Sequence, residues 1–525
     1  MSAITLSDLS WSAPDGRVLF SSLDLTFGPE RTGIVGRNGV GKSTLLQLIS
    51  GDLKAASGHV SRSGTLGVLR QTVQVDPDET VADLFGVGPA RAILRRAEAG
   101  EATLYDLANA DWTLETRMAE ALAHLGLDIG TDTRLAMLSG GQRTRAGLAA
   151  LVFMAPDFLL LDEPTNTLDR DGRQAVFNLL KSWKKGAIVV SHDRELLESM
   201  DAIIELTALG ATRYGGNWSQ YRARKAQDLA AAQADLADAE KRAAEVARNA
   251  QAAAERKARK DGAGQRKAAR GGAPKILLGA MKNRSENTSG SATRLAERQR
   301  TDAFEAAATA RGRIEVLQPL SVILPPARLN PGRSVVTLDT VTAGYSLNHP
   351  VIRDLSFAIT GPERVAITGA NGAGKTTLLA VISGRLAPWS GTVRVTPDMA
   401  LLDQSVSLLD PNLSIRENFR CLHPDADENA CRAALARFMF RADAALQSTG
   451  TLSGGQLLRA GLACVTGGVS APSLLILDEP TNHLDIDSIA AVEAGLRAYD
   501  GALIVVSHDE SFLEAIGLTR RLVLT

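Results

Sequence analysis

The chain has 525 residues, of which 45% are hydrophobic and 22% are charged, and its formal net charge is −1. This length exceeds what one hydrophobic core supports and indicates roughly two to four domains. The near-neutral total predicts no polyanionic partner by itself, and three cysteines without a C-x-x-C spacing exclude a zinc, iron–sulfur or disulfide framework.

The N-terminal residues carry neither the basic nor the apolar segment of a secretion signal. No run approaches the ~18–20 apolar residues that a membrane span requires. We therefore expect a cytoplasmic protein without a membrane segment, so that a channel, if the chain drove transport, would be another polypeptide.

Residues 4–27 alternate between apolar and polar side chains around a turn at Pro14-Asp15-Gly16, which predicts antiparallel strands. Residues 36–44 then read G-x-x-x-x-G-K-[ST]-T, and the same pattern recurs at 369–377, an offset of 333. A short apolar run precedes each copy and a helical run follows it, which is the context of a phosphate-binding loop. Two copies predict two bound nucleoside triphosphates.

In such a loop the glycines let backbone N–H groups point at phosphate oxygens, and the following helix N-terminus adds positive potential. Lys42 and Lys375 would reach the β- and γ-phosphates, while the hydroxyls of Ser43 and Thr376 would ligate Mg²⁺. The loop residues expected to bind ATP are Gly36, Asn38, Gly39, Gly41, Lys42, Ser43 and Thr44, and in the second copy Gly369, Asn371, Gly372, Gly374, Lys375, Thr376 and Thr377.

A glutamine ends a predicted strand in each half, at Gln71 and again at Gln404, with the same offset of 333. Its side-chain carbonyl can hold Mg²⁺ and the attacking water, and the repeated position makes it a candidate site residue. Residues 78–137 then look helical, and they end at a Leu-Ser-Gly-Gly-Gln sequence that recurs in the second half at 452–456.

Apolar strands follow in both halves and end in Asp-Glu, at Asp162-Glu163 and Asp478-Glu479. The carboxyl ends of central parallel strands are where α/β sheets bind ligands. The aspartates suit Mg²⁺ coordination through water, and the glutamates suit activation of the water that attacks the γ-phosphate. Each half then has a strand-end histidine 29 residues after the glutamate, at His192 and His508, suited to contact the γ-phosphate.

This series of motifs resembles the ABC ATPase superfamily over residues 3–215 and 335–525. The resemblance implies two lobes that pair head to tail around two ATP molecules, with Asp169 and Asp485 also at the nucleotides. The signature of each lobe would complete the site of the other. Ser139, Gly140, Gly141 and Gln142 would face Lys375, and Ser453, Gly454, Gly455 and Gln456 would face Lys42.

The halves also differ. From glutamine to signature serine the first half has 68 residues and the second 49, so the first carries 19 extra residues, which we place at about 87–112. They form either a longer surface loop or a small arm that contacts a partner.

The halves also differ at single positions. Where the family usually has a histidine, the first half has Thr167, whereas the second half has the usual residue, His483. Tyr345 could stack on adenine, whereas the first half offers only Trp11, out of register.

Residues 222–260 lack glycine and proline and predict one helix of about 40 residues, roughly 60 Å long at ~1.5 Å per residue. Breaks are expected at 261–264 and 271–274, and a second helical tract at 291–317. Residues 256–300 hold thirteen Lys/Arg and three acids, a net charge of 13 − 3 = +10. This predicts a hairpin whose basic tip recognises the phosphates and shape of structured RNA; a charged spacer is the alternative.

The tandem lobes, the Tyr-Gly-Gly-Asn-Trp-Ser-Gln-Tyr exit at 214–221 and the basic linker resemble the ABC-F family. The resemblance implies an α/β protein of two P-loop ATPase lobes, at 1–215 and 326–525, joined by a helical hairpin at 216–325. It also implies a monomer that enters the tRNA exit site of the ribosome with ATP bound, directs its linker at the P-site tRNA, and leaves after hydrolysis. The alternative is an ATP-hydrolysing subunit of a membrane transporter.

Overall fold

The computed structural model describes residues 2–69, 76–166, 168–207, 210–268, 324–346, 349–482 and 484–524, together with 298, 301 and 305. The chain divides into two compact units. One contains residues 1–219 and 320–525 and carries both lobes; the other contains residues 220–319.

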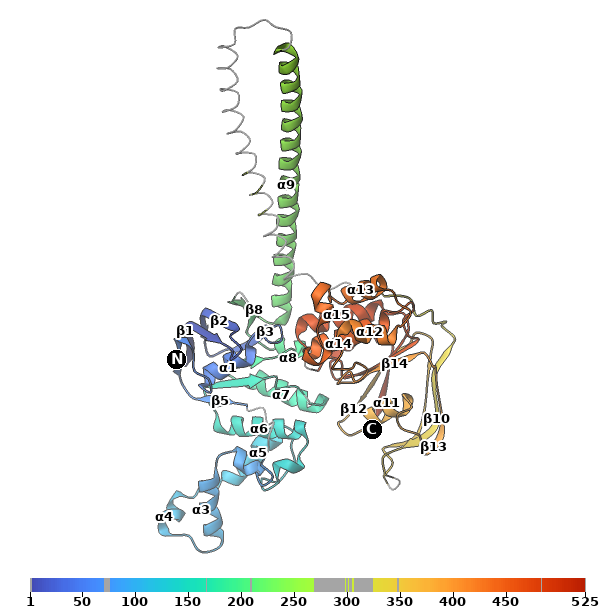
Figure 1. The fold of residues 1–525 in the computed structure, drawn as a ribbon. Coiled ribbons are helices and arrows are strands. Elements are labelled where there is room, and N and C mark those ends of the chain that lie inside the picture. Colours follow the sequence, from blue (N-terminus) through green and yellow to red (C-terminus); the bar gives the residue numbers. More distant parts are fainter. Residues whose placement is uncertain are drawn as a thin grey trace. The chain divides into compact units, whose positions relative to one another are not determined.

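The first lobe has two sheets (Figure 1). A three-stranded antiparallel sheet has the order β2-β1-β4, and its β1 and β2 flank the turn at residues 14–16, as predicted. A six-stranded sheet has the order β5-β6-β7-β3-β8-β9 and is parallel except for β9. The strands are β1 (Ala3–Ser12), β2 (Val18–Phe27), β3 (Arg31–Gly36), β4 (Ser57–Ser63), β5 (Leu66–Val68), β6 (Phe158–Asp162), β7 (Gly186–Val190), β8 (Ala202–Thr207) and β9 (Gly210–Gly215).

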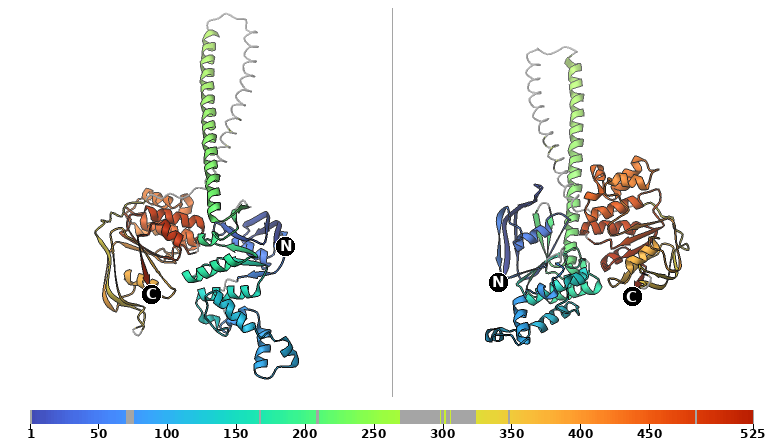
Figure 2. Two further views of the ribbon diagram at one scale, coloured as in Figure 1. Left: turned by 180° about the vertical axis from the view of Figure 1, so that it is seen from behind. Right: turned by 60° about the horizontal axis from the view of Figure 1, so that its bottom comes forward.

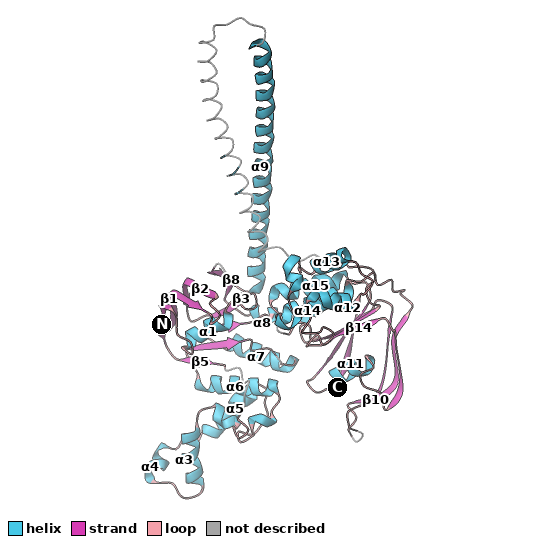
Figure 3. Cartoon of the chain, viewed as in Figure 1, coloured by secondary structure: helices cyan, strands magenta, loops and turns pink. Residues whose placement is uncertain are grey.

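Helices supply the other layers of the first lobe. Between β5 and β6 the described residues form helices and turns but no strand beyond the isolated bridge of Thr80 with Arg134, which confirms the helical character predicted for 78–137 (Figure 3). The helical elements are α1 (Lys42–Ser50), α2 (Val81–Leu84), α3 (Gly88–Glu98), α4 (Leu104–Asn109), α5 (Leu114–His124), η1 (Leu135–Met137), α6 (Gly140–Met154), α7 (Arg170–Ser182) and α8 (Arg194–Leu197).

The second lobe repeats this plan. Its three-stranded sheet has the order β11-β10-β13, and its five-stranded parallel sheet has the order β14-β15-β16-β12-β17. The strands are β10 (Ser334–Ala343), β11 (Ile352–Thr360), β12 (Arg364–Gly369), β13 (Ser390–Val395), β14 (Met399–Leu402), β15 (Leu474–Asp478), β16 (Ala502–Val506) and β17 (Arg520–Leu524). The helical elements are α11 (Lys375–Ile382), α12 (Ile415–Leu422), α13 (Glu428–Arg437), η2 (Ala442–Leu446), η3 (Thr449–Thr451), α14 (Gly454–Thr466), α15 (Ile486–Ala498) and α16 (Glu510–Ala515).

The central strands are buried on both faces, because they are apolar along almost their whole length. In β6 and β15 the first four residues are fully buried, and only the terminal aspartate is partly accessible. This burial fixes the carboxyl edge of each sheet, where the Asp-Glu pairs emerge.

The stretch from 87 to 112 in the first lobe holds α3 and α4, which Figures 1 and 2 show as a small outlying pair beyond α5. The two helices are held together by Arg96, whose guanidinium contacts the Asp106 carboxylate at 2.6 Å. Leu104, Tyr105 and Trp112 are 88%, 75% and 61% exposed, so this pair presents apolar side chains to solvent.

The described part of the second unit consists mainly of α9 (Trp218–Ala268), one helix of 51 residues (Figure 3). The long helix is confirmed, but the break predicted at 261–264 is wrong, since the helix continues through Gly262 and Gly264 to Ala268. A helical glycine costs about 1 kcal/mol relative to alanine, and strong helix formers such as Arg266, Lys267 and Ala268 follow these two.

The predicted break at 271–274 lies outside the described residues, as does most of the predicted second tract at 291–317. In that tract Arg298, Thr301 and Glu305 are described, and all three are helical. The return of the chain as a hairpin stays a prediction. Among the residues described, no helix combines the length and the apolarity needed to cross a bilayer.

Candidate ATP-hydrolysing site

Each phosphate-binding loop connects a buried strand to a helix, β3 to α1 and β12 to α11. Gly41 and Gly374 begin these helices with φ of 107° and 92°. A Cβ on Gly41 would come within 2.7 Å of Phe20, and one on Gly374 within 2.8 Å of Val351. Both positions therefore require glycine for backbone conformation and for space.

The loop lysines fold over their own loops. The Lys42 ammonium donates to the carbonyls of Gly36 and Arg37 at 2.7 and 3.1 Å. Lys375 makes the same pair of bonds, to the carbonyls of Gly369 and Ala370 at 2.8 and 3.1 Å. Burial lowers the pKa of both lysines, so each loop carries a cation that has lost part of its hydration.

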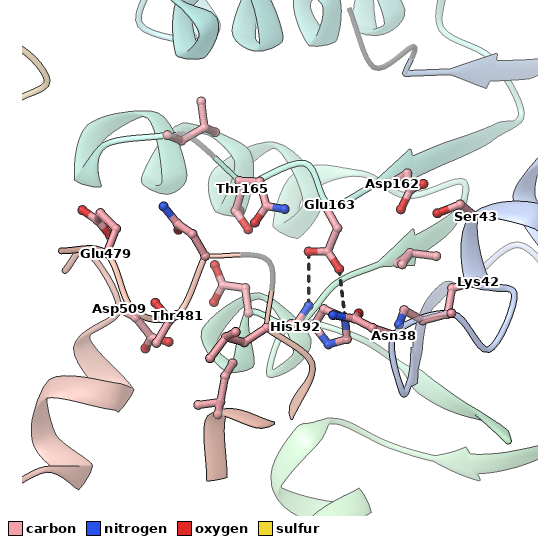
Figure 4. A pocket seen from close by; sticks show the side chains of 18 of the residues that line it. Asn38, Lys42, Ser43, Asp162, Glu163, Thr165, His192, Glu479, Thr481 and Asp509 are labelled. Atoms are coloured by element: carbon pink, nitrogen blue, oxygen red, sulfur yellow. Dashed lines mark hydrogen bonds and ion pairs between the residues drawn. The ribbon is translucent and has the colours of Figure 1, made fainter. Parts of the chain in front are cut away.

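The strand-end aspartates face the loops. Burial raises the pKa of Asp162, and a hydrogen bond from the Ser43 hydroxyl and the charge of Lys42 oppose this shift. Figure 4 shows the Asp162 carboxylate beside Ser43, on the same side of the cavity as Lys42. Two oxygen ligands predicted for Mg²⁺ therefore lie together at the first loop.

The strand-end glutamates have left-handed backbones, with φ of 47° at Glu163 and 46° at Glu479. Their N–H groups donate to Val190 and Val506, on the neighbouring strands. Non-glycine residues in this conformation are strained and concentrate at functional sites. The repeated strain turns both carboxylates at the sheet edge toward the histidines.

Each glutamate faces the histidine of its own lobe, and Figure 4 shows this for Glu163 and His192. Glu163 Oε1 lies 3.4 Å from His192 Nε2, and Glu479 Oε1 lies 3.6 Å from His508 Nε2. Burial, then the adjacent aspartate, raises the pKa of Glu163 to about 8 and that of Glu479 to about 7. Burial lowers the pKa of His192 to about 3 and of His508 to about 4, so both imidazoles are neutral at pH 7.

Within the described part of the chain, three buried polar atoms here have no hydrogen-bond partner: Glu163 Oε1, His192 Nδ1 and His508 Nε2. Buried polar atoms are normally satisfied, and exceptions mark places where a ligand or ion belongs. Together with the loop geometry, these atoms fit a bound Mg²⁺–ATP.

A cavity of about 590 Å³ is lined by residues from both lobes. The first lobe contributes Arg17, Leu19, Asn38, Gly39, Gly41, Lys42, Ser43, Thr44, Asp162, Glu163, Thr165, Asn166, Leu168, Arg173, Val190, His192 and Asp193. The second contributes Asn371, Gln404, Glu479, Thr481, Asn482, Leu484, Ile489, His508 and Asp509. Predicted site residues more than 300 positions apart thus share one cavity.

Other predicted residues do not line this cavity: Gly36, Ser139, Gly140, Gly141, Gln142, Asp169, Tyr345, Gly369, Gly372, Gly374, Lys375, Thr376, Thr377, Ser453, Gly454, Gly455, Gln456, Asp478 and Asp485. Tyr345 is 71% exposed. Gln71, Thr167 and His483 lie outside the described residues.

The signature residues cap helices. Ser139 caps α6 by accepting from the Gln142 N–H at 3.2 Å, and the Gln142 side chain accepts from the Ser139 N–H at 2.9 Å. Ser453 and Gln456 make the same capping box at α14. Both signatures thus present a helix N-terminus, which is an anion-binding element.

The two lobes meet at Asp485, the N-cap of α15. One carboxylate oxygen accepts from Ser488 N–H within the helix, and the other accepts from Asn38 N–H in the first phosphate loop, both at 2.8 Å. The equivalent Asp169 caps α7 by accepting from Gly172 N–H at 3.0 Å. The second lobe therefore contacts the nucleotide loop of the first directly.

Several cavity residues escaped the sequence prediction. Arg17 and Leu19 come from the turn and strand before the loop, and Thr165 and Thr481 follow the Glu-Pro pairs at equivalent positions. The equivalence of the threonines could have revealed them. Arg17 and Arg173 carry no such signal, since Pro350 and Ile489 take their places in the other lobe.

Comparisons with known proteins identify similar sequences and a similar fold. The sequence profile of the family described as ABC transporter matches residues 21–166 and 352–482. The tylosin resistance ATP-binding protein TlrC of Streptomyces fradiae is 34% identical, over 94% of this chain and 92% of its own. The energy-dependent translational throttle protein EttA of Mycobacterium tuberculosis is 32% identical, over 95% and 87%. An archaeal ribosome recycling factor, solved with a ribosomal stalk protein, shares the fold at a TM-score of 0.60 and 18% identity, over 98% and 87%.

The fold and the site define a tandem ATPase with two phosphate-binding loops, two Asp-Glu strand ends and two histidines. Such domains bind and hydrolyse ATP. The chain belongs to the ABC-F family of ABC ATPases.

Proposed function

We propose that this chain hydrolyses ATP in two composite sites, each built from the phosphate loop of one lobe and the signature of the other. The contact of Asp485 with the Asn38 N–H is the observation that carries this proposal. A residue 447 positions away in the sequence closes over the first loop, so a nucleotide bound there joins the two lobes.

The roles follow from the geometry. Lys42 and Lys375 leave their loop carbonyls for phosphate oxygens, and Mg²⁺, when bound, would neutralise charge on the transferred phosphate. The residues proposed to hold Mg²⁺ are Ser43, Gln71 and Asp162 in one site and Thr376, Gln404 and Asp478 in the other. Glu163 and Glu479 orient the attacking water and accept its proton. The neutral His192 and His508 donate a hydrogen bond to the phosphate.

We further propose that the closed, ATP-bound form binds the tRNA exit site of the ribosome and that hydrolysis releases it. The names of two relatives, for translational throttling and for resistance to tylosin, support an action on translation or protection of the ribosome. The chain would act as a cytoplasmic monomer, since one polypeptide supplies both lobes.

The linker would make the RNA contact. Residues 256–300 carry a net charge of +10, so the rest of the chain totals −11. A compact basic segment on an acidic body attracts phosphates, and its binding weakens steeply with salt. We propose that it forms a domain at 216–325, directed at the P-site tRNA, between lobes at 1–215 and 326–525.

The helices at 87–112 would form an arm with exposed apolar side chains for a protein partner.

The test uses Glu163→Gln with Glu479→Gln, which keeps ATP binding and blocks hydrolysis. Sedimentation of this variant through a sucrose gradient is expected to show migration with ribosomes when ATP is present and loss of it without ATP. Deleting 256–300 is expected to abolish the association, and raising the salt from 50 to 200 mM should weaken it by orders of magnitude.

Two controls separate the causes. Adding Lys42→Met and Lys375→Met to the same variant is expected to remove migration, since the lobes then lack nucleotide. Replacing the seven Lys/Arg of 256–270 by glutamine keeps a helix-forming sequence while removing its charge. A variant that remains at the top of the gradient, or that moves with membranes, would contradict the ribosomal function and favour a transporter subunit.

A further inference from the structure

Arg173, in the first turn of α7, connects the two lobes beside the catalytic residues. One guanidinium nitrogen donates to the backbone carbonyl of His508 at 2.7 Å, and another donates to the Asp193 carboxylate at 2.7 Å. The side chains of Arg173 and Asp193 are only 12% and 7% exposed. Charge-assisted bonds shielded from water are stronger than exposed ones, so this bridge holds its partners firmly.

The two partners belong to the histidine loops of the two sites. His508 follows β16 and faces Glu479, and Asp193 directly follows His192, which faces Glu163. Asp193 also caps α8, which fixes its carboxylate. One guanidinium thus ties the loop of the second site to the loop of the first.

The bridge has no equivalent on the other side. The strand-end aspartates, at 162 and 478, set an offset of 316 between the lobes, which places Ile489 at the position of Arg173. Ile489 is buried and lines the cavity, and its side chain has no donor. A second ion pair also joins the two lobes on one side only: Arg194 of the first lobe donates to the buried Glu493 of the second at 2.7 Å. Their equivalents, Glu510 and Phe177, cannot form this pair.

We propose that Arg173 is a positioning residue for the Lys375 site, acting from the opposite lobe. By holding the His508 carbonyl, Arg173 fixes the position of the His508 side chain relative to Glu479. Hydrolysis in this site therefore requires closed lobes and an ordered His192 loop. In the Lys42 site the His192 loop stays anchored without Arg173, because Asp193 also caps α8, so this site depends less on the bridge. The proposal rests on the two hydrolysing sites of the proposed function.

The experiment isolates each site with one glutamate substitution. In the Glu163→Gln chain only the Lys375 site turns over, and in the Glu479→Gln chain only the Lys42 site does. Adding Arg173→Met is expected to lower kcat about tenfold in the Glu163→Gln chain and less than about twofold in the other. Arg173 lines the cavity, but its guanidinium is engaged by the His508 carbonyl and the Asp193 carboxylate, so the KM for ATP should change little in both. Arg173→Lys, which keeps the charge, is expected to restore part of kcat.

Lys181→Met, an exposed cation on the same helix, is the matched control and should alter neither chain. Equal losses in the two backgrounds, or a loss confined to KM, would show a general structural role and overturn the proposal. A Glu163→Gln chain that is inactive before Arg173 is changed would overturn the two-site function and this proposal with it. If the Glu163→Gln chain is active and its kcat is unchanged by Arg173→Met, this proposal alone would be overturned.

Discussion

The two ATP sites carry the same motifs in different surroundings. Lys42 is 8% exposed, whereas Lys375 is only partly buried. Asp485, which reaches the first loop, is buried, and its equivalent Asp169 is partly accessible. The glutamate beside Lys42 also has the higher pKa, about 8 against about 7.

This difference shows that a motif fixes the chemistry of a site but not its enclosure. The loop sequences repeat at a constant offset and fold alike, down to the lysine–carbonyl bonds. What differs comes from the facing lobe: Asp485 over one site, and Arg173 behind the other. Enclosure changes desolvation, and desolvation sets how readily the glutamates ionise.

The largest expected effect comes from the glutamates. Because a general base contributes about 10²–10⁴-fold, Glu163→Gln with Glu479→Gln should reduce phosphate release at least about a hundredfold. If closure of the lobes couples the two ATP sites by about 1–3 kcal/mol, each single variant should fall to about a tenth of the original rate of phosphate release. Single variants that each keep half of the rate would show that the sites are independent and contradict the coupling.

Much of the fold was predictable because its signals are local. Alternating residues 4–27 gave β1 and β2, and the apolar runs before Asp162 and Asp478 gave β6 and β15. The repeated strand ends also marked the glutamates and histidines as candidate site residues, whereas the approach of each glutamate to the histidine of its own lobe is a finding of the structure.

What escaped prediction depends on contacts between distant segments or on a balance of propensities. The bond of Asp485 to Asn38 spans 447 residues, and the φ of 47° at Glu163 arises where a turn leaves a buried strand. No sequence period encodes either. The helix through Gly262 and Gly264 depends on whether favourable neighbours outweigh two glycines, which residue type alone does not decide.

A smaller effect is expected from the aspartates that cap α15 and α7. Asp485→Ala removes a helix cap and the bond to Asn38, and it should weaken ATP binding at the Lys42 site about tenfold. Asp169→Ala should weaken the Lys375 site only about threefold, because Asp169 is less enclosed. Each is measured by titration with a fluorescent ATP analogue, in Lys375→Met and Lys42→Met chains respectively. Equal losses would remove the contrast between the sites.

The last effect concerns stability without ATP rather than binding or turnover. The pKa of Glu163 rises from an ordinary 4.5 to about 8 on folding, so the folded chain binds more protons than the unfolded chain between these values. Stability from this group is complete below about pH 4.5 and declines as the pH rises through 8, by about 1.4 kcal/mol per pH unit within the window. For Glu479 the window closes near pH 7.

Thermal melts from pH 5.5 to 8.5 measure this difference. Glu163→Gln should flatten the decline up to about pH 8, and Glu479→Gln only up to about pH 7, because glutamine cannot ionise. The histidines act in the opposite direction: the pKa of His192 falls from 6.5 to about 3, so stability is lost as the pH falls below about 6.5. This contribution remains in the variants and cancels when they are compared with the original chain. If melting temperature depended on pH in the same way for all chains, neither glutamate would be desolvated. If both substitutions flattened the decline over the same pH range, the two sites would be equally enclosed.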